Sequence, residues 1–327
     1  MKAIVQNRYG PPSVLALADV ATPTPAAGEV LVRVEAAALN AYDWHVMRGD
    51  PRLARLSIGR SGPRARIRGR DFAGRVSAVG AGVQRLRPGD AVFGDLGDAN
   101  GAFAEYVRVP ESMVASAPSN LTPQQAAALP LAGVTALLGL RDVSSGQQVL
   151  INGASGGVGT LAVQLAKAFG ATVTAVCSTR NVDLVRSLGA DDVVDYTRAD
   201  FTRAGRHDVV LDLVGNRSLT ALRRALTPRG TLVLSGGGVY RGGSLVGPVW
   251  LIARGRLLAP FVRQRIVVPA ATPSREHLET LRAHAEAGRL TPVIDRTYPL
   301  AEVPEAIRYL ETEHARAKVV ITLDAAS

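Results

Sequence analysis

A run of small residues at 152–159, Asn-Gly-Ala-Ser-Gly-Gly-Val-Gly, has the residue types and spacing that suit a bound phosphate group. Ala154, Gly156 and Gly159 match the dinucleotide-binding fingerprint, with alanine in its first position. Small residues permit a tight turn, and they let backbone N–H groups approach a pyrophosphate whose charge a helix N-terminus stabilises. We therefore expect a nucleotide to bind here. The alternative is a glycine turn that serves only close helix packing.

The two central glycines, Gly156 and Gly157, predict what a side chain would do in this loop. A valine at either position would fill the space where the N–H groups meet the pyrophosphate, and it would oppose a positive φ there. We expect such a variant to lose cofactor binding and to keep its fold.

The residues about 20 positions beyond the loop predict which cofactor binds. An Asp or Glu there would hold the ribose 2′-hydroxyl of NAD, but the sequence has Ser178, Thr179 and Arg180, with no carboxylate until Asp183. These side chains can donate hydrogen bonds to a 2′-phosphate, and arginine does so through a charged, rigid fork. We predict NADPH. The alternative is that Arg180 is one more arginine facing solvent.

Alternating strands and helices over residues 123–267 predict the sheet that must hold these groups. The segment begins with a capping box at Thr122-Pro123-Gln124-Gln125. Near-continuous apolar strands separated by helices require crossovers, and hence a doubly wound parallel sheet. The expected strands are 149–151, 172–177, 193–195, 209–212 and 231–234, and the expected helices are 158–169, 182–188 and 218–226.

The first third of the chain reads as a β-rich domain. Residues 30–36 alternate apolar and polar side chains, and 74–80 and 90–94 are short strands bounded by glycines. The tail predicts helices at 274–287 and 303–310 and a strand at 318–322. The simplest topology returns this tail to the N-terminal domain, so we expect one domain of residues 1–122 and 268–327, and a second of 123–267.

Composition narrows the functional classes. The 327 residues favour two domains, and the single cysteine excludes an intrachain disulfide. Only three of the 38 basic residues are lysines; the arginines are scattered and aromatic residues make up 5%, so nucleic acid is not an expected partner. The densest arginine cluster, 60–70, reads as a solvated loop. The longest uncharged stretch, 126–140, is too short to span a membrane, and no secretory signal is evident, so we expect a cytoplasmic protein without a membrane partner.

These features together resemble the zinc-independent members of the medium-chain dehydrogenase/reductase superfamily, in the quinone oxidoreductase (zeta-crystallin-like) branch. The resemblance implies an NADPH-dependent α/β reductase, usually dimeric, with a GroES-like β-rich catalytic domain and a doubly wound Rossmann domain. It also implies that Tyr196 helps to hold the 2′-phosphate. The matching segments are 40–44, 69–74, 79–83, 88–94, 154–159 and 314–320. The cofactor contacts expected beyond those already named are Thr135, Ser155, Val158, Val214, Gly215, Ser235, Gly236, Gly237 and Lys318.

No zinc site is expected. Zinc-dependent alcohol dehydrogenases of this superfamily carry Gly-His-Glu where this chain has Gly69-Arg70-Asp71, and they use cysteine ligands that this chain lacks. A cationic arginine cannot ligate zinc. Chemistry without a metal suits quinones and activated enones, which accept hydride with little Lewis-acid help.

The candidate groups on the substrate side are Asn40, Asp43, Trp44 and, less strongly, His45. Asn40 could donate to a substrate oxygen and Asp43 could fix neighbouring groups, or both could simply cap a turn. Trp44 could be a stacking wall or a core residue. Ala317 stands where relatives commonly have glycine.

Three functional hypotheses follow. The first is an NADPH-dependent reductase of quinones or enones; the second is a reductase of enoyl thioesters or aldehydes on the same scaffold. The third is a nucleotide-binding regulatory protein without turnover. We also predict a homodimer, which is usual in the family that the chain resembles. The β-branched run at 263–268 supports it, because this run would otherwise leave an unpaired sheet edge.

Overall fold

The computed structural model describes residues 1–236, 242–247, 249–313 and 315–323. It divides into unit 1, Met1–Val134 with Thr272–Ser327, and unit 2, Thr135–Ala271. The first boundary therefore falls later than the predicted one after residue 122. The Thr122 capping box does form, since the Gln125 amide N–H donates to Thr122 Oγ1 at 3.3 Å and the Thr122 N–H to Gln125 Oε1 at 3.0 Å. The helix it starts packs on the unit 1 sheet instead of opening unit 2.

Unit 1 is built on a seven-stranded sheet in the order β14-β15-β3-β4-β5-β7, with β6 also paired to β3. β14 and β15 are parallel, and the pairs among the other strands are antiparallel. The C-terminal strands thus join the N-terminal sheet, as the tail topology predicted. The strands are β3 (Glu29–Ala38), β4 (Asp71–Val79), β5 (Ala91–Asp95), β6 (Tyr106–Pro110), β7 (Val114–Ser116), β14 (Ile294–Pro299) and β15 (Lys318–Thr322), and β1 (Lys2–Gln6) pairs with β2 (Leu15–Asp19) in a separate sheet.

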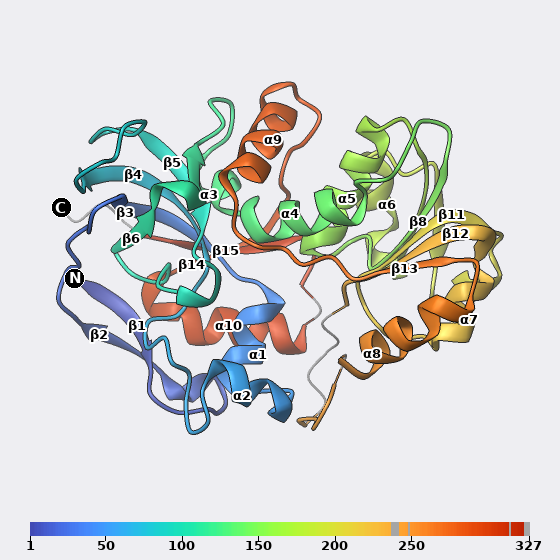
Figure 1. Ribbon diagram of the computed structural model, residues 1–327, viewed down its shortest axis with the longest axis horizontal. Helices are drawn as coiled ribbons and strands as arrows, with labels where there is room; N and C mark the ends of the chain where they lie inside the picture. The colour runs from blue at the N-terminus through green and yellow to red at the C-terminus, as the bar shows by residue number, and fades with distance from the viewer. Residues whose placement is uncertain (237–241, 248, 314, 324–327) are drawn as a thin grey trace. The chain divides into compact units, whose positions relative to one another are not determined.

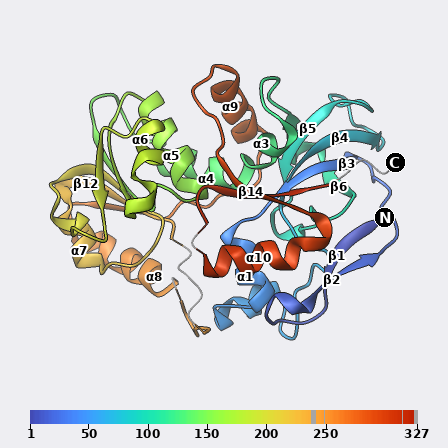
Figure 2. The ribbon, with the colours of Figure 1, turned by 180° about the vertical axis from the view of Figure 1, so that it is seen from behind.

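The helices of unit 1 pack around this sheet. α3 contacts β3 and β4, and α10 contacts α1 and β15 (Figures 1 and 2). α10 has the alternation of buried and exposed residues that its contacts require, with Val303, Ala306 and Ile307 buried. The helices are α1 (Ala41–Arg48), α2 (Arg55–Ile58), α3 (Pro123–Ala127), α4 (Pro130–Gly139, which continues into unit 2), α9 (Arg275–Glu286) and α10 (Val303–Thr312).

Unit 2 is a six-stranded parallel sheet in the order β10-β9-β8-β11-β12-β13. From β8 the chain runs outward to β9 and β10 and then returns to β11, so the order reverses between β8 and β11. This is the doubly wound topology that the sequence predicted. The strands are β8 (Gln148–Asn152), β9 (Thr172–Cys177), β10 (Asp192–Asp195), β11 (His207–Asp212), β12 (Leu226–Leu234) and β13 (Arg265–Val267).

Helices cover both faces of this sheet, with α5 and α6 on one side and α7 and α8 on the other (Figure 1). The strand interiors are apolar because both faces are covered; Leu150, Val176, Val210 and Leu232 are at most 1% exposed. The helices are α5 (Gly157–Ala168), α6 (Val182–Ser187), α7 (Leu219–Arg224) and α8 (Val249–Leu258). Across the described ranges, no helix has the length and apolar character needed to cross a membrane.

Candidate functional site

The glycine loop connects β8 to α5 at the carboxyl end of the strand. Gly156 is the N-cap of α5, and its carbonyl accepts the first intrahelical bond from Thr160 N at 3.0 Å. The N–H groups of the first helical turn, residues 157–159, therefore have no acceptor within the helix. A helix start with unpaired donors is a favourable place for a phosphate group.

The structure gives a different account of the glycine at each of three positions in this loop. Gly153 has a φ of 89°, which favours glycine. A Cβ on Gly159 would lie 2.1 Å from the Gly153 carbonyl oxygen, so only glycine lets α5 pack this closely on the loop. A Cβ on Gly156 would lie 3.4 Å from the same oxygen, and its φ is −83°. The positive φ expected at Gly156 or Gly157 was wrong: Gly153 makes the turn, and Gly157 begins the helix.

Asn181 joins the glycine loop to the end of β9, a role that the sequence analysis missed. Its Nδ2 donates to Ser155 Oγ at 3.0 Å and to Ser178 Oγ at 3.2 Å, while the residue is 4% exposed. Its Oδ1 is buried without a hydrogen-bond partner in this structure. The only sequence signal was its place directly after Arg180, at the start of α6.

The end of β9 carries the residues predicted to select the cofactor. Ser178 is half-buried, whereas Arg180 is exposed. The Thr179 hydroxyl instead donates to the Asp195 carboxylate at the end of β10, which also accepts from Thr197. These hydrogen bonds lower the pKa of Asp195. The Thr179 hydroxyl proton is thus already used in a hydrogen bond to Asp195. This weakens the assignment of Thr179 as a donor to a 2′-phosphate.

Tyr196 follows β10 and lies next to the end of β9, because its backbone N–H donates to the Cys177 carbonyl at 3.1 Å. Its side chain is 44% exposed. Strand pairing therefore brings Tyr196 beside Ser178, as an assignment of both to one phosphate requires.

Asp212, at the carboxyl end of β11, holds together the loops that follow β8, β11 and β12. Its Oδ1 accepts from Asn152 Nδ2 at 2.8 Å and from the N–H groups of Val214 and Gly215, at 3.2 and 3.1 Å. The Asp212 carbonyl accepts from Ser235 N at 2.9 Å. This anchor was also missed, because nothing in the local sequence distinguishes a buried Asp at a strand end from an exposed one.

Gly236 lies against the same loop: a Cβ there would be 2.7 Å from Gly215 N, so the approach requires glycine. Gly237, and position 314 at the start of the matching segment 314–320, lie outside the described residues. Thr135 lies in α4 at the first position of unit 2 and is buried.

The predicted cofactor contacts of unit 2 thus follow neighbouring parallel strands, at the carboxyl ends of those strands. The loops after β8, β9, β11 and β12 meet at the carboxyl ends, around the point where the strand order reverses. In doubly wound sheets, ligands bind outside the carboxyl ends of the strands at this reversal point. The residues brought together there are Ala154, Ser155, Gly156, Gly157, Val158, Ser178, Val214, Gly215, Ser235 and Gly236.

In unit 1, the candidate residues before and within α1 form a buried capping arrangement. The Asn40 N–H donates to Asp43 Oδ2 at 2.8 Å, and Asp43 is 1% exposed. Burial raises the pKa of Asp43, and the Arg68 guanidinium lowers it. Trp44 is 4% exposed and stacks on His45 with 3.6 Å between the ring centroids. This burial favours the capping and core interpretations of Asp43 and Trp44 over direct substrate contact.

Lys318 completes this cluster from β15. Its Nζ donates to Asn40 Oδ1 at 2.6 Å and to the Leu39 carbonyl at 3.0 Å, and it lies 3.7 Å from Asp71 Oδ2. Asn40 Nδ2 in turn donates to Asp71 Oδ2 at 2.9 Å. The Lys318 ammonium is therefore directed into unit 1, where it orients the Asn40 amide, a different role from the predicted cofactor contact.

Burial has the largest effect on the pKa values of Asp71 and Lys318. It raises the pKa of Asp71 to about 7 although Lys318 lowers it, and it lowers the pKa of Lys318. Asp71 Oδ1 also accepts the backbone N–H of Leu131 at 3.2 Å. The Asp71 carboxyl is thus harder to ionise than an exposed aspartate, because burial outweighs the nearby Lys318 charge.

The arginine cluster at 60–70 is only in part the solvated loop that we expected. Arg70 is 6% exposed and makes a bidentate ion pair with Asp95, at 2.8 and 2.6 Å. Burial lowers the Arg70 pKa, but the Asp95 hydrogen bonds and charge raise it more, so it lies above its ordinary value. Arg68 is 1% exposed. Asp95 binds Arg70 directly, whereas the guanidinium nitrogens of Arg68 are buried without a hydrogen-bond partner in this structure. Burial lowers the pKa of Arg68, and the charge of Asp43 offsets this only in part.

The described residues do not fit a zinc site. The resemblance puts Arg70 in the place of a zinc-binding histidine, and the structure shows its guanidinium bound by the Asp95 carboxylate. Within the described ranges, no group of three or more His, Cys, Asp or Glu side chains could hold a metal ion.

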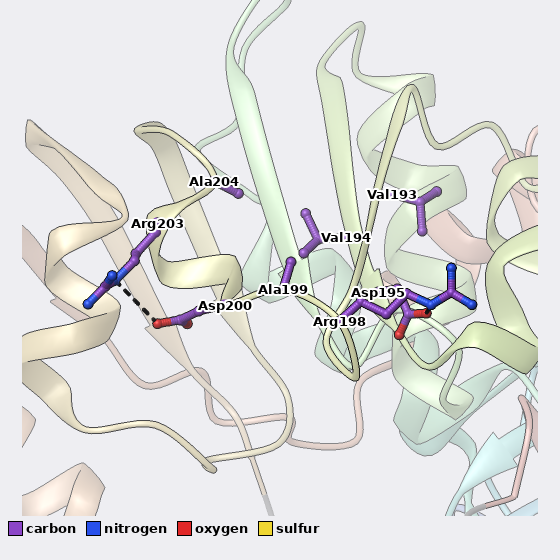
Figure 3. Close-up of a pocket in the computed structure, with 8 residues that line it drawn as sticks. All are labelled: Val193, Val194, Asp195, Arg198, Ala199, Asp200, Arg203 and Ala204. Carbon is purple, nitrogen blue, oxygen red and sulfur yellow. Dashed lines mark ion pairs between the residues drawn. The ribbon is translucent and has the colours of Figure 1, made fainter.

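A pocket of about 550 Å³ lies along the outer strand β10 and the loop after it (Figure 3). Its two arginines are each paired with an aspartate, Arg198 with Asp195 at 3.6 Å and Arg203 with Asp200 at 3.8 Å. Its charges are therefore balanced. It lies at the sheet margin and contributes Asp195 alone to the residues considered above.

Comparison with known proteins agrees with this geometry. Residues 26–119 match the alcohol dehydrogenase GroES-like domain, and residues 188–321 match a domain described as zinc-binding dehydrogenase. The chain is 38% identical to 2-methylene-furan-3-one reductase of Solanum lycopersicum, covering 98% of this chain and 79% of that protein. The chain belongs to the medium-chain dehydrogenase/reductase family.

Other members of the family extend the match. The chain is 34% identical to the chloroplastic NADPH-dependent alkenal/one oxidoreductase of Arabidopsis thaliana, over 98% of this chain and 79% of that protein. The solved quinone oxidoreductase of Coxiella burnetii is 33% identical, with a TM-score of 0.84 and 99% of each chain covered. The quinone oxidoreductase of Escherichia coli, solved with NADPH, is 25% identical with a TM-score of 0.83, covering 98% of this chain and 100% of that one.

Proposed function

We propose that this family member is an NADPH-dependent oxidoreductase that reduces quinones or activated enones without zinc. The observation that carries the proposal is the glycine loop: a helix start with free N–H groups, at the reversal point of a doubly wound sheet, beside a β9 end that offers Ser178 and Arg180. The names of the relatives, an alkenal/one oxidoreductase, a furanone reductase and quinone oxidoreductases, support the substrate class.

The residues present fit NADPH. The N–H groups of residues 157–159 and the helix dipole would stabilise the pyrophosphate, and the close approach that Gly159 permits keeps that surface free of side chains. Ser178, Arg180 and Tyr196 would hold the 2′-phosphate. When bound, NADPH would supply a hydride, which with one proton from solvent would saturate the C=C bond of an enone or reduce a quinone to a hydroquinone.

The cluster of unit 1 supports this chemistry as a rigid frame. Lys318 and Asp71 hold both polar atoms of the Asn40 side chain, and Asp43 holds the Asn40 backbone N–H. We assign Asn40, Asp71 and Lys318 a positioning role, because their polar side-chain atoms already have partners within unit 1. No step is routed through a metal ion, since the donor set does not fit one.

A screen of NADPH oxidation tests the proposal. Purified protein is given quinones, enones, enoyl thioesters and saturated aldehydes, each with and without a chelator. We expect turnover with quinones or enones that survives chelation. Turnover with enoyl thioesters or aldehydes alone would favour the second hypothesis, and tight NADPH binding without turnover would favour a regulatory protein.

Two further properties stay predictions. β13 is an edge strand of the unit 2 sheet, which leaves room for the homodimer expected through this edge; light scattering at micromolar concentration should give twice the chain mass. A cytoplasmic location is tested by fractionating cells that express the tagged protein.

A further inference from the structure

Asn181 links the two loops that we expect to hold the phosphate groups of the cofactor. The short helical turn Thr179–Asn181, after β9, folds back on Ser178, and the Asn181 backbone N–H donates to the Ser178 carbonyl at 2.9 Å. The side chain then reaches the glycine loop, since Nδ2 lies 3.0 Å from Ser155 Oγ and 3.2 Å from Ser178 Oγ. One amide nitrogen thus contacts a hydroxyl group in each loop.

The direction of these two hydrogen bonds follows from the burial of Asn181. The residue is 4% exposed, and its Oδ1 has no hydrogen-bond partner among the described residues. If the amide were turned round, two N–H donors would be buried unpaired in place of one carbonyl oxygen. Unpaired buried N–H groups are rarer in proteins than carbonyl groups that lack a partner. The two N–H bonds of Nδ2 therefore point to the two serines, and both hydroxyl oxygens accept.

A serine hydroxyl whose oxygen accepts a hydrogen bond still has its own proton to donate. Ser155 and Ser178 are half-buried, and among the described residues neither hydroxyl proton has an acceptor. Thr179 differs from them, because its hydroxyl donates to Asp195. The Asn181 amide thus leaves two fixed hydroxyl donors that suit an anionic acceptor, one in each loop.

We propose that Asn181 is a positioning residue that orients both serine hydroxyls as donors to the phosphate groups of NADPH. Ser155 would donate to the pyrophosphate, and Ser178 to the 2′-phosphate. This assignment rests on the proposed function, which supplies the cofactor. NADH has the pyrophosphate but lacks the 2′-phosphate, so Asn181 contributes to the choice between the two cofactors through Ser178 alone.

Titration calorimetry with NADPH and with NADH tests this role on the full chain. Asn181→Leu removes the amide and both of its hydrogen bonds. Loss of one oriented hydroxyl should weaken binding by about fivefold, so NADH, which loses one, should bind about fivefold more weakly. NADPH loses both and should bind about 25-fold more weakly, which lowers the preference for NADPH by about fivefold.

A double substitution separates positioning from general loosening of the loop. In a Ser178→Ala protein the hydroxyl that contacts the 2′-phosphate is already gone. Adding Asn181→Leu to it should therefore weaken the binding of NADPH and NADH by the same factor. Ser187→Ala, which removes an exposed hydroxyl from α6, is the matched control and should change neither affinity.

Asn181→Asp keeps the size of the side chain and provides the test if the leucine variant does not fold. Its carboxylate only accepts, so it draws both hydroxyl protons away from the phosphates, and the preference for NADPH should fall at least as far. Thermal melting identifies the folded variants.

A folded Asn181→Leu protein that melts earlier but keeps the wild-type preference for NADPH would overturn the inference, since the amide would then serve packing alone. An equal fall in that preference with and without Ser178 would also overturn it. In both cases NADPH still binds to the wild type and the proposed function stands. Wild-type protein that does not bind NADPH would refute the proposed function, and the role of Asn181 with it.

Discussion

At the scale of single residues, the Lys318 ammonium is a buried charge held by several partners. It is 2% exposed and joins Asn40 and Asp71, residues that lie far from it in the sequence. Sequence patterns could single out Asn40, Asp43 and Lys318 as unusual, but they could not show that these residues bind one another. Asp71 itself was noted only as part of the segment that replaces a zinc motif. Contacts between distant positions depend on strand pairing, which local spacing does not determine.

The raised pKa of Asp71 predicts a pH-dependent stability. Its pKa is about 7 in the fold and 3.8 ordinarily, so the folded chain binds this proton more tightly than the unfolded chain. The resulting stabilisation is fully present below pH 3.8 and is lost as the pH rises through about 7. Relative to Asp71→Asn, the free energy of unfolding of the wild type should therefore fall by a few kcal/mol across that range. Denaturant unfolding at several pH values measures it, and parallel profiles would refute the assignment.

Arg180 predicts the preference for NADPH. Charge-assisted hydrogen bonds are worth roughly 1.5 to 3 kcal/mol, so Arg180→Ala should weaken NADPH binding on the order of tenfold and leave NADH binding unchanged. Arg186→Ala, which removes an exposed arginine from α6, is the matched control. Titration calorimetry with both cofactors gives the comparison. An equal loss for NADPH and NADH would show that Arg180 does not bind the 2′-phosphate.

At the scale of elements, the strand, loop and helix around the glycines were predictable, because fingerprint spacing and apolar periodicity agree there. The spacing could not show why glycine is required at each individual position of the loop. We expect Gly159→Ala to lower stability by roughly 1 to 3 kcal/mol, since its Cβ would meet the Gly153 carbonyl. Gly156→Ala should melt near the wild-type temperature, and Gly156→Val should keep its fold but lose NADPH binding. Thermal melting beside NADPH titration tests both, and a Gly156→Val protein that binds NADPH normally would contradict the loop assignment.

The turn before β15 offers a second test at this scale. Ala317 has a φ of 58°, a left-handed conformation that glycine adopts without strain. This accounts for the glycine that the family resemblance leads us to expect here, and Ala317→Gly should raise the free energy of unfolding by about 1 kcal/mol. Ala21→Gly, at an exposed loop position of unit 1, has no positive φ to relieve and should not stabilise the protein. Equal effects of the two substitutions in denaturant unfolding would count against the explanation.

At the scale of the whole molecule, the sequence predicted two sheets and their fold class because each sheet has its own periodicity. It misplaced the first domain boundary, since a capping box marks where a helix begins and not which sheet the helix packs on. It also treated the arginine excess as uniform bias. The fold concentrates part of that excess around one pocket of unit 2, which becomes visible only when residues 206, 223, 224 and 263 are brought together.

The central claim is that this chain transfers hydride from NADPH to a quinone or enone. The most direct measurement supplies NADPH deuterated at the transferred position together with an α,β-unsaturated ketone, and locates the label in the product by mass spectrometry and NMR. We predict a saturated ketone that carries one deuterium on the β-carbon and keeps its carbonyl group, and NADPH oxidation by quinones under the same conditions. Deuterium on the carbonyl carbon, or no oxidation of NADPH by any quinone or enone, would contradict the account.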